Sequence, residues 1–487
     1  MIALLVALGA SCAVIGCSSE SHGPRSMALA ECRLTGLPAA AQCGVLEVPE
    51  NRTQPLGRRI QLFVAVLPAH TLTPKPDPLV ILAGGPGQAA TALAPFASRL
   101  VDVRRHRDIV LVDQRGTGRS SPLECAAFAP SADPAEVFDT DPGPRAKRCA
   151  EELAANGVDL TQYTTAAWID DLERVRAALG YQRWNLWGGS YGTRAALDYL
   201  RRHGERVRAL VLDGVASPSL KVSSGVWITR QQALEAVFDA CAASAACASS
   251  HPSLRGTLDA IERSLGPRGR TVDVRDPRTG QAHALTLTFP AVLSTLYPLT
   301  YVPELASAIP EILQRASAGD FSPLLAVAQL VSTNLAEQMN VALHFAVTCS
   351  EDAPRVGTAD RAQLAGLRSE ALAMQMLAAC AAWPKGTLAA DSFQPVRSDV
   401  PVLLLSGGLD PVTLPAYAEE VRATLGNSRH IVAAGYGHIV SPHACGPRLV
   451  AAFIGHAGFD SLPQTCIDHF TRSTRPPLWA DHLAPLP

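Results

Sequence analysis

The chain has 487 residues, of which 47% are hydrophobic and 18% are charged, and its formal net charge at pH 7 is −2. This composition excludes an intrinsically disordered chain, and the near-neutral charge gives no reason to expect nucleic acid as a partner. The chain is longer than chains that usually form a single compact hydrophobic core. We therefore expect one large domain with an insertion, or two domains.

The chain begins with an apolar, uncharged segment. Residues 1–17 are shorter than a typical transmembrane helix, and they fit the apolar region of a secretory signal. The sequence VIGC that ends at Cys17 resembles a bacterial lipobox, in which the cysteine is lipidated after cleavage. We therefore predict a signal with lipidation at Cys17, membrane attachment through this lipid, and a tether over 18–31. The alternative is an ordinary secretory signal cut near Ala28 or Ala30.

Cysteine usage also points to export into an oxidising compartment, either the cell envelope or the medium. Removing Cys12 and Cys17 from the twelve cysteines leaves ten, and no CxxC metal pattern occurs. We expect up to five disulfides between cysteines that lie close in sequence, although sequence alone leaves the connectivity open. The couples are Cys32–Cys43, Cys125–Cys149, Cys241–Cys247, Cys349–Cys380 and Cys445–Cys466.

Short apolar runs that end in glycine-rich turns predict buried parallel strands. They cover residues 79–83, 109–112, 184–187, 207–212, 402–405 and 430–433. Helical patterns over 166–179 and 193–202 alternate with the runs. This alternation predicts a mostly parallel, doubly wound sheet covered by helices on both faces.

Residues 215–400 interrupt the alternation. They read mainly as helices, with a hairpin over 270–287. An insertion between two strands of one sheet is most simply a cap over the carboxyl edge of the sheet, where ligands bind in open α/β folds. The core is then expected to comprise residues 32–214 and 401–470, with a C-terminal tail over 471–487.

The sequence GGSYG at 188–192, which we call the serine elbow, matches G-x-S-x-G between an apolar strand and a helix. Glycines there allow a sharp turn that lifts the Ser190 hydroxyl above the sheet and aims the Tyr191 N–H at a developing oxyanion. The alternative interpretation is a glycine–serine loop at the start of a helix. The strand and helix around the motif favour a nucleophilic serine.

A serine hydroxyl needs a base to remove its proton. After such an elbow, the acid and then the histidine follow along the chain. Asp410, in SGGLDP, and His438, in GYGH, each follow a predicted strand. The alternatives are a turn-forming Asp-Pro at Asp410 and His443 as the base.

Two further glycine-rich loops follow early strands. AGGPG at 83–87 contains what we call the GGPG loop (84–87), and we expect the N–H of Gly85 to complete the oxyanion hole; a tight turn without catalytic part is the alternative. DQRGTG at 113–118 lacks G-x-G-x-x-G and lies outside the first strand–helix unit. We therefore expect it to be a structural loop and not a nucleotide site.

Four segments together resemble the α/β-hydrolase peptidases that include proline iminopeptidases and tripeptidyl aminopeptidases. They are AGGPG at 83–87, DQRGTGRS at 113–120, WGGSYGTR at 187–194 and SGGLDPVT at 406–413. The resemblance spans about residues 32 to 470. The SGGLDPVT segment and the paired cysteines resemble the secreted tripeptidyl-aminopeptidase branch more than the small cytosolic iminopeptidases. The family's usual histidine before GGPG is Ala83 here, a departure that we expect to affect loop packing and not chemistry.

The resemblance implies the α/β-hydrolase fold with a helical cap inserted before the late strands. It also implies acidic groups that hold the free amino terminus of the substrate. Glu351 and Asp352, inside the insertion, resemble that feature, and we expect Glu351 to pair with the α-ammonium.

The sequence thus predicts an exported serine aminopeptidase that acts on peptides through Ser190, His438 and Asp410, with no metal or organic cofactor. One alternative is a carboxylesterase or lipase on the same triad, because the fold hosts both activities. The other is a cell-envelope binding protein without catalysis.

Overall fold

The computed structural model of the protein describes residues 26–129, 131 and 133–472. The predicted signal, its lipidation site Cys17 and nearly all of the predicted tail lie outside these residues. No helix within the described ranges is long and apolar enough to cross a membrane.

The strands of the described core form one nine-stranded sheet in the order β1-β2-β3-β5-β4-β6-β7-β10-β11. The first three strands are antiparallel to their neighbours, and β5, β4, β6, β7, β10 and β11 run parallel. The strands are β1 (Ala30–Cys32), β2 (Ala41–Pro49), β3 (Arg59–Leu67), β4 (Leu79–Leu82), β5 (Ile109–Val112), β6 (Trp184–Gly189), β7 (Val207–Asp213), β10 (Val402–Gly407) and β11 (Ser428–Ala433). The six parallel strands were predicted; β1, β2 and β3 were not.

Helices cover both faces of the sheet because side chains along each strand alternate between them. Val80 and Leu82 of β4 pack on one face, with α5, α6 and α17, whereas Leu79 and Ile81 pack on the other, with α1, α18 and α19. The predicted doubly wound fold is confirmed. The core helices are α1 (Ala94–Arg99), α2 (Val101–Arg104), α3 (Pro134–Val137), α4 (Gly143–Ala155), α5 (Thr165–Ala178), α6 (Tyr191–His203), α17 (Pro415–Arg422), α18 (Gly446–His456) and α19 (Gln464–Thr471).

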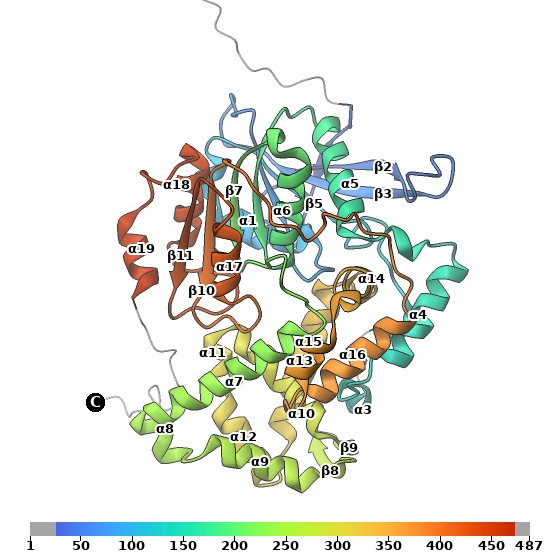
Figure 1. Cartoon of the computed structure of the whole chain (residues 1–487), viewed down its shortest axis with the longest axis vertical. Coiled ribbons are helices and arrows are strands. Elements are labelled where there is room, and N and C mark those ends of the chain that lie inside the picture. The colour runs from blue at the N-terminus through green and yellow to red at the C-terminus, as the bar shows by residue number, and fades with distance from the viewer. Residues whose placement is uncertain (1–25, 130, 132, 473–487) are drawn as a thin grey trace, which may run out of the picture.

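Residues 215–400, which we call the inserted segment, lie between β7 and β10 and gather in the lower half of Figure 1. They contain the hairpin β8 (Arg270–Arg275) and β9 (Ala282–Leu287), and Tyr297–Tyr301 form a 3-10 turn. The helices are α7 (Gly225–Ala243), α8 (Ala245–Ser250), α9 (Leu254–Leu265), α10 (Phe289–Leu296), α11 (Pro303–Ala306), α12 (Ile309–Ser317), α13 (Ser322–Gln338), α14 (Val341–Glu351), α15 (Thr358–Leu364) and α16 (Glu370–Ala382).

Hydrogen bonds join the inserted segment to loops at the carboxyl edge of the sheet. The Asn340 N–H donates to the Gly87 carbonyl after β4 at 2.8 Å, and the His438 N–H after β11 donates to the Tyr301 carbonyl at 3.0 Å. The segment therefore lies at the edge where the predicted site residues gather.

Five disulfides occur among the described residues, and they join the couples that lie close in sequence: Cys32–Cys43, Cys125–Cys149, Cys241–Cys247, Cys349–Cys380 and Cys445–Cys466. Within the inserted segment, Cys349–Cys380 ties α14 to α16 and Cys241–Cys247 ties α7 to α8. Each disulfide closes a local loop.

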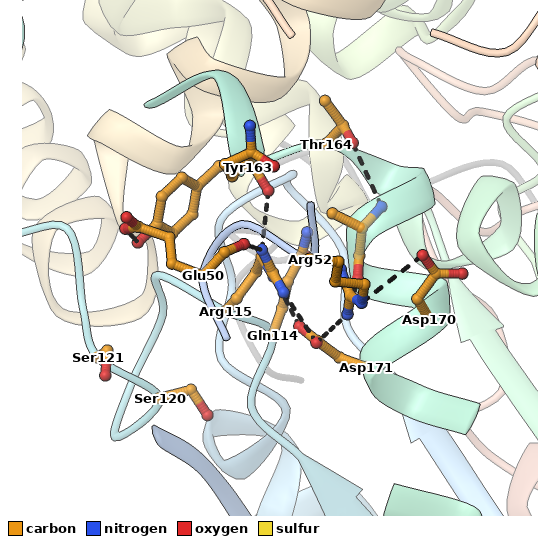
Figure 2. Close-up of polar contacts among 12 residues, drawn as sticks. Glu50, Arg52, Gln114, Arg115, Ser120, Ser121, Tyr163, Thr164, Asp170 and Asp171 are labelled. Atoms are coloured by element: carbon orange, nitrogen blue, oxygen red, sulfur yellow. Dashed lines mark hydrogen bonds and ion pairs between the residues drawn. The ribbon is translucent and has the colours of Figure 1, made fainter. Parts of the chain in front are cut away.

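The DQRGTG loop is built into the core by a buried ion pair (Figure 2). Arg115 and Asp171 are both fully buried, and the guanidinium donates to both carboxylate oxygens at 2.6 and 2.8 Å. Arg115 also donates to the carbonyls of Glu50 and Gln162, and Arg52 forms a second ion pair with Asp171. Four hydrogen bonds to protein groups hold the arginine in place, as expected for a structural loop.

Replacement of Asp171 by Asn should destabilise the protein by about 3–5 kcal/mol, because it removes the counter-charge of the fully buried Arg115 and leaves Arg52 with only its longer contact to Asp170. Urea denaturation without reductant measures the change in unfolding free energy. The control is Asp102→Asn, whose partner Arg105 is 66% exposed, and which should not measurably shift the midpoint. Equal midpoints for the two variants would contradict the structural role.

Candidate active site

The serine elbow is a strained turn between β6 and α6. Ser190 has φ 55° and ψ −123°, in a region that residues with a side chain rarely occupy. A Cβ at Gly188 would collide with the Gly192 carbonyl, and one at Gly192 would collide with the Leu82 carbonyl of β4. Only glycine therefore allows this approach of helix and strand, and the turn presents Ser190 at the carboxyl edge of the sheet.

His438 and Asp410 form the second part of the site. The Nδ1 atom of His438 lies 2.8 Å from Oδ2 of Asp410. The carboxylate is almost fully buried; its Oδ1 accepts the N–H groups of Val412 and Thr413 at 2.8 Å each, and its Oδ2 accepts the Thr413 hydroxyl at 2.7 Å. These donors orient Asp410 toward the imidazole. Thr413 was not among the predicted site residues, although it lies inside the SGGLDPVT segment.

The structure places His438 beside the serine elbow without joining it to the hydroxyl. The Ser190 N–H donates to the carbonyl of Asp213 at 2.9 Å, and a Cβ on the next residue, Gly214, would lie 3.1 Å from Cε1 of His438. Among the described residues, the Ser190 hydroxyl has no hydrogen bond to the imidazole. Such contacts are often long in unliganded enzymes and tighten when substrate binds.

Asp213, which the sequence analysis did not single out, holds the segment that follows His438. Its carboxylate, fully buried at the end of β7, accepts the N–H groups of Val440 at 2.8 Å and Ser441 at 2.7 Å. Burial raises the pKa of Asp213, and these donors oppose the rise. The available sequence signal was an aspartate directly after a predicted strand.

The GGPG loop lies next to the serine elbow, since a Cβ at Gly84 would lie 3.1 Å from the Cβ of Ser190. The N–H groups of Gly85 and Tyr191 have no acceptor within the described part of the chain. The Gly85 backbone has φ 106°, which favours glycine. These two free donors near the serine suit the expected oxyanion hole, which stays a prediction.

Glu351 and Asp352 lie behind the elbow and already have partners. Glu351 accepts the N–H of Thr165 at 2.7 Å and its hydroxyl at 2.9 Å, and that hydroxyl lies 2.8 Å from the Tyr191 hydroxyl. Asp352 binds both terminal nitrogens of Arg194 at 3.0 Å. A substrate ammonium that binds Glu351 or Asp352 would therefore bind a carboxylate that already accepts hydrogen bonds from Thr165 or Arg194. Their role in binding the amino terminus stays a prediction.

The alternative base His443 is exposed and lies against the Tyr436 ring, 5.8 Å between centroids, with no carboxylate partner in the described ranges. The structure thus brings His438, and not His443, to Asp410. No three His, Cys, Asp or Glu side chains of the described residues gather in a way that could hold a metal ion.

The ionisation of His438 gives a test of its pairing with Asp410. Burial is the largest single influence and disfavours the imidazolium, but the charge and hydrogen bond of Asp410, together with the charge of Asp213, raise the pKa of His438 above its ordinary value. Because only the neutral imidazole can accept the Ser190 proton, the rate of labelling by a fluorophosphonate should rise with pH, with a midpoint above about 6.5.

In Asp410→Asn the midpoint should move to lower pH, and the plateau rate should fall by about 10⁴. Labelling rates measured across pH 4–9 test both parts. Asp460→Asn, which changes an exposed carboxylate, is the control and should leave the profile unchanged. An unmoved midpoint in Asp410→Asn would show that this carboxylate does not set the pKa of the base.

Two family models match the chain: one described as alpha/beta hydrolase fold over residues 77–258, and one described as TAP-like protein over 367–466. A tripeptidyl aminopeptidase of Streptomyces lividans is 31% identical over 200 residues, which are 38% of this chain and 37% of that protein. A probable proline iminopeptidase of Streptomyces coelicolor is 39% identical over 146 residues, 30% of this chain and 35% of the relative. The serine protease Hip1 of Mycobacterium tuberculosis is 31% identical over 198 residues, 38% and 37% respectively.

The matched segments span little more than a third of the length of these curated relatives. They agree with the resemblance seen in the sequence motifs, which is confirmed. The sheet order, the helices on both of its faces and the two family models lead to the same conclusion. The chain has the α/β-hydrolase fold, and its residues 367–466 are similar to TAP-like proteins.

Proposed function

We propose that the protein is a serine exopeptidase that removes residues from the amino ends of short peptides. The observation that carries the proposal is the His438–Asp410 pair, which lies beside a strained serine elbow in a chain whose relatives are named as peptidases.

In the proposed reaction, the Ser190 oxygen attacks the carbonyl carbon of the scissile bond while Nε2 of His438 takes its proton. Asp410, at Nδ1, stabilises the imidazolium, and the N–H groups of Gly85 and Tyr191 receive the oxyanion. His438 then gives the proton to the leaving amine, and water hydrolyses the acyl-enzyme through the same base.

We also propose that the protein is exported. Its support is the five disulfides, because such bonds persist in oxidising compartments and are rare in the bacterial cytosol. A lipid at Cys17 would then hold the protein at a membrane. We propose that the inserted segment restricts access to the site, since it contacts loops on both sides of Ser190.

The first test compares release of a chromogenic amine from mono-, di- and tripeptide substrates with free and blocked amino ends. We expect activity on free-amino substrates only, and a loss of about 10⁶ in kcat in Ser190→Ala. Ser249→Ala, which changes an exposed serine on α8, should keep full activity.

Hydrolysis of short acyl esters alone would replace the peptidase by an esterase on the same residues. A folded protein that hydrolyses none of these substrates and does not react with a fluorophosphonate would instead support a binding protein.

Glu351→Gln tests the proposed amino-terminal anchor. The amide keeps the size of the side chain but not its charge, so the preference for free-amino over amino-blocked substrates should fall about tenfold or more. The ratio of the two kcat/KM values measures this preference. Glu136→Gln, an exposed glutamate on α3, is the control. An unchanged ratio in Glu351→Gln, with activity retained, would remove Glu351 from substrate binding.

A further inference from the structure

Helix α7 of the inserted segment carries a guanidinium group that aromatic side chains hold in place. The Arg230 guanidinium carbon lies 5.1 Å from the centroid of the Trp227 ring and 5.8 Å from that of Tyr301. One terminal nitrogen donates to the Tyr301 hydroxyl at 3.0 Å. Contacts with two rings and one hydrogen bond restrict the side chain to one position.

Tyr301 links this guanidinium to the proposed base. The rings of Tyr301 and His438 pack edge to face, with 5.3 Å between their centroids. The backbone N–H of His438 also donates to the Tyr301 carbonyl at 3.0 Å. Tyr301 therefore lies between Arg230 and His438 in a chain of contacts, and both Arg230 and Tyr301 belong to the inserted segment.

The charge of Arg230 also acts toward the GGPG loop. His344 of α14 lies with Nδ1 3.2 Å from the Pro86 carbonyl of that loop. Burial lowers the pKa of His344 to about 4, and the positive charge of Arg230 adds to this effect. The same charge opposes protonation of His438, where burial is the larger opposing cause. The positive charge of Arg230 thus acts on both histidines, His344 and His438.

Arg230 has no counter-ion among the described residues. Its Nε is buried without an acceptor, and so is Nε1 of the neighbouring Trp227. The two other partly buried arginines of the inserted segment are paired: Arg368 with Asp259 and Glu262, and Arg355 with Asp352. A buried donor without an acceptor and a charge without a counter-ion both raise the free energy of the folded protein. A negatively charged acceptor would remove both penalties.

We propose that Arg230 binds a carboxylate of the substrate, on the leaving-group side of the scissile bond. A carboxylate matches the planar donor fork of a guanidinium and supplies the missing charge. The leaving-group side follows because Arg230 reaches the site through Tyr301 and His438, and His438 is the group that protonates the leaving amine. This inference rests on the proposed function of Ser190 and names a class of substrate for it.

The carboxylate has two sources: the free C-terminus of a peptide with one residue after the scissile bond, or an acidic side chain at that residue. Three peptides with the same amino-terminal part distinguish them. The first ends in a neutral residue with a free carboxylate, the second in the same residue as an amide, and the third in an acidic residue as an amide. Chromatography of the products gives kcat/KM for each.

We expect the wild-type protein to cleave at least one carboxylate peptide about tenfold or more faster, in kcat/KM, than the neutral amide. In Arg230→Met this ratio should fall to about one, and Arg230→Lys, which keeps the charge without the fork, should lie between. Arg263→Met, an exposed arginine on α9, removes the same charge from the inserted segment and should leave the ratio unchanged. Labelling by a fluorophosphonate checks that each variant keeps a folded site.

A wild-type ratio near one, or a ratio that Arg230→Met leaves intact, overturns the inference and leaves the proposed hydrolysis standing. If the wild-type protein cleaves none of the three peptides, calorimetric binding to Ser190→Ala decides. The site is supported if Ser190→Ala binds a carboxylate peptide more tightly than the neutral amide and the double variant Ser190→Ala/Arg230→Met does not. Equal affinity of Ser190→Ala for the carboxylate and neutral peptides overturns it. Failure of cleavage and of labelling together would reject the proposed function independently of Arg230.

Discussion

The buried carboxylate of Asp213 connects the two halves of the candidate site. Its backbone carbonyl accepts the Ser190 N–H, and its side chain accepts two N–H groups of the segment after His438, 227 and 228 residues further along the chain. A buried carboxylate needs such donors, since an unpaired one would be very costly. The serine elbow and the histidine are therefore positioned relative to each other by a single residue at the end of β7.

A second set of buried charges connects α6, the helix that follows the serine elbow, to the inserted segment. Arg194 of α6 binds Asp352, and Glu351 reaches the Tyr191 hydroxyl through Thr165. The carboxylates of Glu351 and Asp352 with Arg194 and Arg355 make the group neutral overall, whereas Arg230 has no counter-ion among the described residues. We proposed that Glu351 binds the amino end of the substrate and that Arg230 binds a carboxylate beyond the scissile bond. Under both proposals, the distance between these two residues limits the length of the peptide that binds.

Much of the fold could be predicted because buried parallel strands are continuous apolar runs bounded by glycine-rich turns. β4, β5 and β10 have this form most clearly, whereas β11 is only partly buried but still ends in an apolar run before a glycine-rich turn. The antiparallel strands β2 and β3 do not end in such turns, and the alternating exposure along β2 weakens its apolar signal, so they were missed. The disulfide couples were suggested by short sequence separations, but only the approach of the chain segments decides the pairing.

The sequence by itself determined the local features of the site: the glycines that permit the strained turn at Ser190, and the aspartate and histidine that follow late strands. These signals are readable because they depend on a few adjacent residues. Only the tertiary structure decided that His438 meets Asp410, that Asp213 holds the segment after His438, and that Arg230 contacts Tyr301. Such contacts join residues far apart in the chain, and the packing of the whole fold, which no local pattern records, brings them together.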